Sequence, residues 1–150
     1  DKSVKCSNFI GETIDMIVEM GFQKMLLVGH MGKLIKVAGG IMNTHSREAD
    51  CRMELLAALS ISKGVNADLI REMMNCVTTE DAVKILNKSG KMQQVMDKVV
   101  ERIIYYLEKR AGGRFSIDCI IYTNELGELS KSKEALSWSA LQVQEQGQKI

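Results

Sequence analysis

The residues whose types and spacing could do chemistry are concentrated in residues 28–47 (VGHMGKLIKVAGGIMNTHSR). This segment holds both histidines of the chain and three cationic side chains, and it contains no Asp or Glu. A short apolar run over residues 25–28 leads into it. Glycines after a strand let the backbone approach a ligand, and the first N–H groups of a helix attract anions. We therefore predict that this segment receives an anionic ligand.

The two histidines each allow a structural and a functional interpretation. His30 directly follows Gly29 and precedes Gly32 by two residues. It is either a buried histidine satisfied by a backbone carbonyl, or a donor to a ligand carboxylate or an acid–base group near neutral pH. His45 lies in the run Asn43-Thr44-His45-Ser46, which is either an extended helix N-cap or a set of polar ligand contacts.

The two lysines and the glycine pair of the segment also allow two interpretations each. Lys33 and Lys36 are three residues apart, so on a helix they share a face that is either solvated or in contact with an anion. Gly39 and Gly40 would each cost a helix about 1 kcal/mol relative to alanine. We therefore expect that the helix breaks there or that another group packs against the bare backbone.

Three known phosphate-binding signatures were compared with the glycine segment. A Walker P-loop fails, because Leu27 and Leu34 occupy the positions that need Gly and Ser or Thr. A GxGxxG dinucleotide fingerprint does not fit, because two residues separate Gly29 from Gly32 where the motif begins with glycines one residue apart. The GxxG pattern of the RNA-binding KH module fits residues 28–35, but KH modules place that loop between two helices and a strand is predicted here. RNA binding therefore stays a minor alternative.

The composition fits one ordinary globular domain of 150 residues, with a formal net charge of +1. Such a balance argues against binding nucleic acid or acidic membranes through bulk charge, and no apolar stretch is long enough to span a membrane. The four cysteines form no CxxC pair, which favours reduced thiols in a cytoplasmic protein. Two histidines without a nearby Cys or acid do not make a metal site.

Hydrophobic periodicity and capping residues predict an α/β fold, a helix-rich layered domain around a small, mainly parallel sheet with a C-terminal hairpin. We expect this domain to cover residues 1–130, followed by a weakly ordered or helical tail over residues 131–150. Strands are expected at residues 25–28, 115–122 and 128–130. Helices are expected from a Ser7 or Asn8 cap to about residue 20, from a Ser46 cap to about 62, and at 66–76, 79–87 (capped by Thr79) and 91–110.

Three stretches of the sequence resemble the cobalt-precorrin-5B C1-methyltransferases of anaerobic cobalamin synthesis: residues 5–12 (KCSNFIGE), 28–36 (VGHMGKLIK) and 38–46 (AGGIMNTHS). The resemblance extends more loosely through residues 50–59 and 117–127, and none is identified beyond residue 131. It implies S-adenosylmethionine-dependent methyl transfer to C1 of a cobalt-containing tetrapyrrole. Family members are over twice as long, and this chain starts at Asp1 without an initiator Met. We therefore expect a carboxyl-terminal part that needs the missing N-terminal part of the same protein.

The resemblance also implies which residues bind the substrate or the cofactor, without separating the two. A tetrapyrrole with many carboxylates needs cations and backbone N–H groups around a surface open to a flat ring. Catalytic residues stay unknown, and the chain is open to being a monomer or a homo-oligomer. The candidate site consists of Ser7, Asn8, Gly29, His30, Gly32, Lys33, Lys36, Gly39, Gly40, Asn43, Thr44, His45 and Ser46.

A second reading makes the chain a non-catalytic module that binds an acidic tetrapyrrole while the absent part performs the reaction. A third, RNA binding through the GxxG loop, predicts an affinity that falls steeply with salt. A missing acid–base dyad does not decide against an enzyme, because methyl transfer from a sulfonium depends mainly on aligning donor and acceptor.

Overall fold

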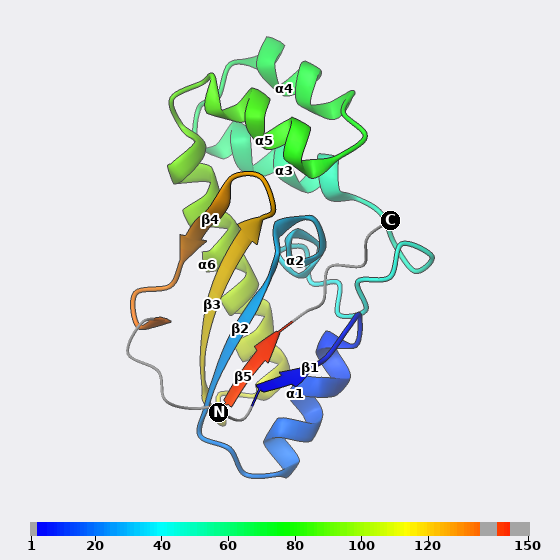
Figure 1. The fold of residues 1–150 in the computed structure, drawn as a ribbon, viewed down its shortest axis with the longest axis vertical. Helices are drawn as coiled ribbons and strands as arrows, with labels where there is room; N and C mark the ends of the chain where they lie inside the picture. The colour runs from blue at the N-terminus through cyan, green and yellow to red at the C-terminus, as the bar shows by residue number, and fades with distance from the viewer. Residues whose placement is uncertain (1–2, 136–140, 145–150) are drawn as a thin grey trace.

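The computed structural model describes residues 3–135 and 141–144. Its sheet has five strands, and the predicted mainly parallel sheet with a hairpin is confirmed (Figure 1). Neighbouring strands are parallel except the last pair, which forms the antiparallel hairpin. In spatial order the strands are β1 (Ser3–Lys5), β5 (Leu141–Gln144), β2 (Lys24–His30), β3 (Ser116–Thr123) and β4 (Gly127–Lys131).

Helices cover the sheet on one face and gather beyond one end of it (Figure 1). The long helix α6 packs along β3 and β4 and contacts α1 and α2, whereas α3, α4 and α5 pack on one another. None of these helices, within the part of the chain that the structure describes, is long and apolar enough to cross a membrane. The helices are α1 (Ile10–Glu19), α2 (Met31–Val37), α3 (Arg52–Ser62), α4 (Ala67–Met74), α5 (Thr79–Asn87) and α6 (Met92–Ala111).

The core forms where the apolar stripe of α6 packs against the sheet, and buried residues of β2 and β3 belong to the same hydrophobic cluster. Residues that recur along α6 at helical spacing, such as Val95, Val99 and Ile103, are fully buried. In the parallel register, Met25 lies opposite Ile117, and both are buried. The C-cap of this helix is Gly112, whose φ of 66° is the left-handed conformation that glycine adopts without strain. The strong periodicity of this segment explains why its prediction is confirmed.

Three predicted helix starts are wrong. The helix expected from Ser46 begins only at Arg52, because the polar side chains before it make local turns instead: Asn43 Oδ1 accepts from His45 N, and His45 Nδ1 accepts from Arg47 N. Neither Ser7 nor Asn8 caps α1, whose N-cap residue is Phe9. Helix α5 is capped by Thr78, not Thr79, through a bond from Asp81 N to Thr78 Oγ1.

The predicted helical or weakly ordered tail is wrong for residues 141–144, which form β5 between β1 and β2. Lys131, the first residue of that predicted tail, ends β4. Strand β1 was not predicted at all. Residues 136–140 and 145–150 lie outside the described residues.

Candidate functional site

A cleft of about 650 Å³ lies where the carboxyl ends of β2 and β3 meet the first turns of α2 and α5. His30 at the end of β2 stands opposite Tyr122 of β3, so these two strands end side by side. In parallel sheets such an edge is where ligands bind. The cleft is lined by Asn8, His30, Gly32, Lys33, Lys36, Thr44, His45, Ser46, Arg52, Val77, Thr78, Thr79, Glu80 and Asn124.

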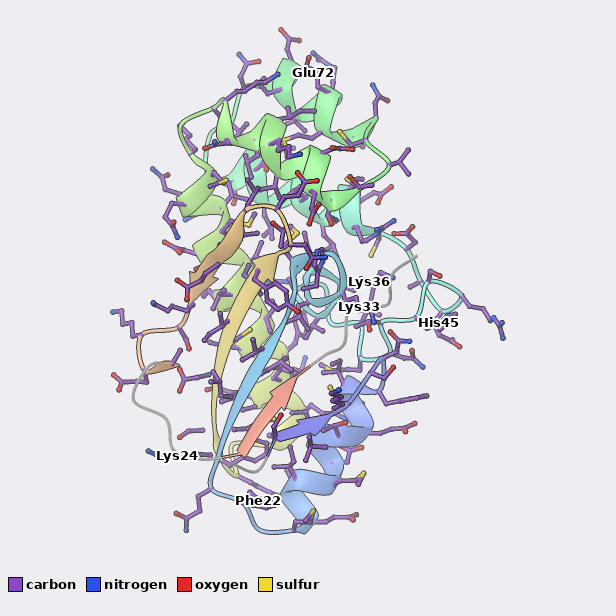
Figure 2. The ribbon with its side chains drawn as sticks, in the orientation of Figure 1. Phe22, Lys24, Lys33, Lys36, His45 and Glu72 are labelled. Carbon is purple, nitrogen blue, oxygen red and sulfur yellow. The ribbon has the colours of Figure 1, made fainter. Side chains whose placement is uncertain are left out.

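Most of the candidate residues predicted from the sequence come together around this cleft. Eight of them line it: Asn8, His30, Gly32, Lys33, Lys36, Thr44, His45 and Ser46. Asn43 lines a smaller cavity beside it. Figure 2 shows Lys33 and Lys36 on α2, with His45 on the loop that extends away from that helix.

Four predicted site residues line neither cavity. Gly29 is buried within β2 and pairs with Ile121, and Ser7 has a positive φ of 49° in the turn before α1. An added Cβ at Gly39 would lie 2.8 Å from Leu55 Cδ2, and one at Gly40 would lie 2.9 Å from Tyr106 Cε1. Both outcomes expected for the glycine pair therefore hold: α2 ends at Val37, and side chains pack against the bare backbone. The structure gives these two glycines a packing role.

His30 is fixed in one orientation at the mouth of α2. Its Nδ1 accepts a hydrogen bond from Gly32 N at 3.0 Å, which caps the helix. When the ring is neutral, Nε2 therefore carries the proton and points to Glu80 Oε1, 3.4 Å away. The ring also packs edge-on against Tyr122, with centroids 5.9 Å apart. His30 is thus a half-buried side chain with a fixed orientation, and its Nε2 is a hydrogen-bond donor inside the cleft.

Glu80 is the acidic group that lines the cleft, and its ionised form is favoured. Partial burial acts to raise the pKa of Glu80, but the hydrogen bonds from His30 and from the backbone N–H groups of Asn124 and Glu125 outweigh it, and the net pKa lies below the ordinary value. The bond from Asn124 N to Glu80 Oε1 measures 3.0 Å. Glu80 therefore ties α5 to the turn after β3 as a carboxylate.

Three polar residues form a buried chain at the base of the cleft. Lys36 is 3% exposed, and its Nζ donates to the Thr44 carbonyl at 2.9 Å. Thr44 Oγ1 donates to Asn8 Oδ1 at 3.0 Å, and Thr44 N bonds to the Asn8 carbonyl. This chain joins α2, the loop after it and the turn before α1, and it brings a cation to the cleft wall.

The cationic side chains outnumber the acidic ones along the cleft. Lys33, Lys36 and Arg52 line it, against Glu80 alone. Arg52 is held in place by two bonds to the carboxylate of Asp50, of 2.9 and 3.2 Å. The hydrogen bond from Arg52 is the main reason why the pKa of Asp50 is lowered. Asp50 offsets the charge of Arg52, so the positive excess along the cleft comes from Lys33 and Lys36 against Glu80. Positive charge fixed in a concave site attracts a carboxylate ligand.

A smaller cavity of about 220 Å³ adjoins the cleft. It is lined by Asn8, Phe9, Asn43, His45, Arg47 and Glu48. Because Asn8 and His45 line both cavities, the two spaces are neighbours on either side of these residues. The described residues contain no group of three or more His, Cys, Asp and Glu side chains that could hold a metal ion.

Several lining residues of the two cavities were not predicted from the sequence. Asn124 could have been found, because it follows β3 directly and the carboxyl ends of neighbouring parallel strands share an edge. Thr78, Thr79 and Glu80 gave no such signal, since their place depends on how α3, α4 and α5 return to the sheet. Phe9 was not predicted as a site residue either, and it is 51% exposed.

Comparison with known proteins agrees with the resemblance. The family model described as CbiD, C-terminal domain, matches residues 43–133. The protein named cobalt-precorrin-5B C(1)-methyltransferase of Ruminiclostridium cellulolyticum is 43% identical over 129 residues, which cover 86% of this chain and 34% of the relative. The protein of the same name from Methanocaldococcus jannaschii is 40% identical over 129 residues, 86% of this chain and 35% of the relative.

The chain spans about a third of the length of the curated relatives that it matches. No solved structure is significantly similar to it. The match of the family model covers more than half of the chain and includes α3 to α6 and the β3–β4 hairpin. The chain therefore belongs to the family of the CbiD C-terminal domain.

Proposed function

We propose that this chain is the carboxyl-terminal part of an S-adenosylmethionine-dependent methyltransferase that methylates C1 of cobalt-precorrin-5B in anaerobic cobalamin biosynthesis. Its large cleft holds part of the tetrapyrrole. The observation that carries the proposal is the cation-rich cleft at the carboxyl ends of β2 and β3, where eight residues of the predicted site meet. The relatives named cobalt-precorrin-5B C(1)-methyltransferase, which align with 86% of this chain, support this reaction.

The lining suits a flat polyacid. Precorrins carry many acetate and propionate groups, and the positive charges of Lys33, Lys36 and Arg52 along the cleft attract carboxylates. Val77, which is 84% exposed, gives the rim of the cleft an apolar contact for the face of a macrocycle. The volume of about 650 Å³ lies in the range of sites that bind small molecules and cofactors.

Methyl transfer requires the protein to align the methyl donor with the ring carbon that accepts the methyl group. S-adenosylmethionine supplies an electrophilic methyl group when it is bound, and the residues of this chain orient the ring and exclude water from it. His30, with Nδ1 bonded to Gly32 N and Nε2 directed at Glu80, is a rigid donor within this site. Such a donor fixes the position of a bound carboxylate or amide.

The test uses a chimera in which this chain replaces the matching third of the R. cellulolyticum relative. Methyl transfer from labelled S-adenosylmethionine to cobalt-precorrin-5B is measured for the chimera and for its His30→Ala and Asn43→Ala variants. We expect both substitutions to lower turnover at least about tenfold without unfolding the protein. Full turnover in both variants would defeat the assignment of the site, and an inactive chimera with a stable fold would defeat the proposed reaction.

The second candidate is a ligand-binding module in which another part of the protein performs the transfer. It is favoured by one observation, that the chain covers only about a third of its relatives. In this case the isolated chain binds a tetrapyrrole without binding the cofactor product, and titration with each ligand separates the two functions. The RNA alternative receives no such support, since the GxxG segment follows strand β2 and not a helix.

A further inference from the structure

We infer that the smaller cavity is the adenine subsite for the adenosyl group of the methyl donor, which leaves the large cleft to the tetrapyrrole. The inference rests on the proposed function and divides its site in two. The smaller cavity, at about 220 Å³, has room for a base but not for a macrocycle, and the larger one has about 650 Å³. Because Asn8 and His45 line both, the two spaces are neighbours, as a transfer between two bound ligands requires.

Phe9 gives the small cavity an aromatic face. Its ring is 51% exposed, although the residue stands between the buried Asn8 and the buried Ile10. The backbone of Phe9 forms an antiparallel bridge with Asn43, and residues opposite each other in such a bridge carry their side chains on the same side. An aromatic ring and an amide therefore face one space, and bases stack on exposed aromatic rings of this kind.

Asn43 offers the polar edge that adenine recognises. Its Oδ1 accepts one hydrogen bond from His45 N at 3.1 Å, which fixes the plane of the amide and leaves the second lone pair of the oxygen. Its Nδ2 makes no hydrogen bond to any residue in the described part of the chain. A paired amide donor and acceptor match the N7 acceptor and the N6 donor of adenine.

Asn8 is an independent sign of a ligand. The residue is 7% exposed, and its Oδ1 is held by Thr44 Oγ1, yet its Nδ2 has no hydrogen-bond partner among the residues described. This nitrogen is not sealed off, because Ser60 Oγ is the one fully buried side-chain polar atom without a partner in that part of the chain. A buried amide that keeps an open donor at the junction of two cavities needs an acceptor there, such as a ribose hydroxyl.

The experiment measures the Kd of the 150-residue chain for S-adenosylhomocysteine and for S-inosylhomocysteine by calorimetry. Phe9→Ala removes the stacking face and should weaken binding of the first ligand about 5- to 100-fold. The wild-type chain should prefer the adenosyl ligand at least about tenfold, and Asn43→Ala should abolish that preference, because the inosyl base carries an acceptor where adenine has a donor. Met16→Ala, which trims another exposed apolar side chain of the same region, should change neither Kd.

Each variant is also unfolded in urea, and Asn43→Asp, which keeps an oxygen for His45 N, serves if Asn43→Ala loses its fold. Uroporphyrin, an octacarboxylate porphyrin, is titrated in parallel. If Phe9→Ala and Asn43→Ala bind S-adenosylhomocysteine as tightly as the wild type, the adenine subsite is wrong and the proposed function stands. If the chain binds uroporphyrin but not S-adenosylhomocysteine, the adenine subsite is wrong and the ligand-binding module is favoured over the methyltransferase site. Binding of neither ligand overturns both.

Discussion

His30 Nε2 lies 3.4 Å from Glu80 Oε1, so the residue that ends β2 is joined to the first turn of α5 fifty positions later in the chain. Glu80 also accepts a hydrogen bond from Asn124 N, in the turn after β3. One carboxylate thereby connects three walls of the cleft. The shape of the site and the stability of the fold depend on the same contact.

The first prediction concerns the pH dependence of stability. Because the pKa of Glu80 is lower in the folded chain than its ordinary value of 4.5, the unfolded chain takes up the proton more readily. The contribution of Glu80 is therefore complete above about pH 4.5 and is lost as the pH falls through the lowered pKa. Glu80→Gln should cost about 1 kcal/mol at pH 7 and progressively less in acid. Urea unfolding of both proteins between pH 3 and 7 measures the difference.

The Glu80→Gln variant should still lose some stability as the pH falls, because the pKa values of Asp15 and Asp50 are lowered as well. The main causes are hydrogen bonds from Arg110 to Asp15 and from Arg52 to Asp50. The matched control is Glu101→Gln, on the exposed surface of α6, which should leave the pH profile unchanged. Parallel profiles for wild type and Glu80→Gln would show that the ionised Glu80 carboxylate contributes nothing to stability.

The second prediction tests how closely α2 approaches α5. A Cβ added at Gly32 would lie 2.7 Å from Thr79 Oγ1 and 3.1 Å from His30 Nδ1. Alanine favours the helix by about 1 kcal/mol, but overpacking at a buried position costs about 1–3 kcal/mol, and Thr79 is 3% exposed. Gly32→Ala should therefore destabilise the chain. The double variant with Thr79→Ala should recover part of the loss, and strictly additive free energies of unfolding would contradict the contact.

The third prediction separates packing from binding. Gly40 has a φ of 85° and lies against the ring of Tyr106, outside both cavities. Gly40→Ala should cost about 1–3 kcal/mol of stability, since the left-handed conformation is strained for any residue with a Cβ. The folded fraction should bind uroporphyrin as the wild type does. A higher Kd for uroporphyrin at unchanged stability would show that Gly40 contributes to binding and not to packing.

The spacing of apolar residues was sufficient to predict the helices and strands that have a strong hydrophobic periodicity. The stripe on α6 and the apolar runs of β2 and β3 are confirmed because one face of each must be buried, and that requirement is written in the spacing of residues. The start of α3 was wrong because Asn43 and His45 bond to the backbone two residues ahead, as a cap would, without beginning a helix.

Long-range pairing could not be predicted in the same way. Strand β5 lies between β1 and β2, so its partners come from the other end of the chain, and β1 has only three residues. The residues of the cleft and of the smaller cavity also divide into those that could be predicted from the sequence and those that could not. The cations and histidines of residues 28–47 were found from composition, whereas Glu80 and Phe9 take their places through tertiary packing alone.

The central claim is that the cleft of this chain binds a polycarboxylate ring, and one titration tests it most directly. Uroporphyrin is titrated into the wild-type chain and into its Lys33→Gln and Lys24→Gln variants. These make the same change of charge on α2 at the cleft and at the far, amino-terminal end of β2 (Figure 2). Loss of a charge-assisted hydrogen bond should raise the Kd about tenfold or more for Lys33→Gln and leave it unchanged for Lys24→Gln. Equal Kd values in all three proteins, or no binding to the wild type, would contradict the account.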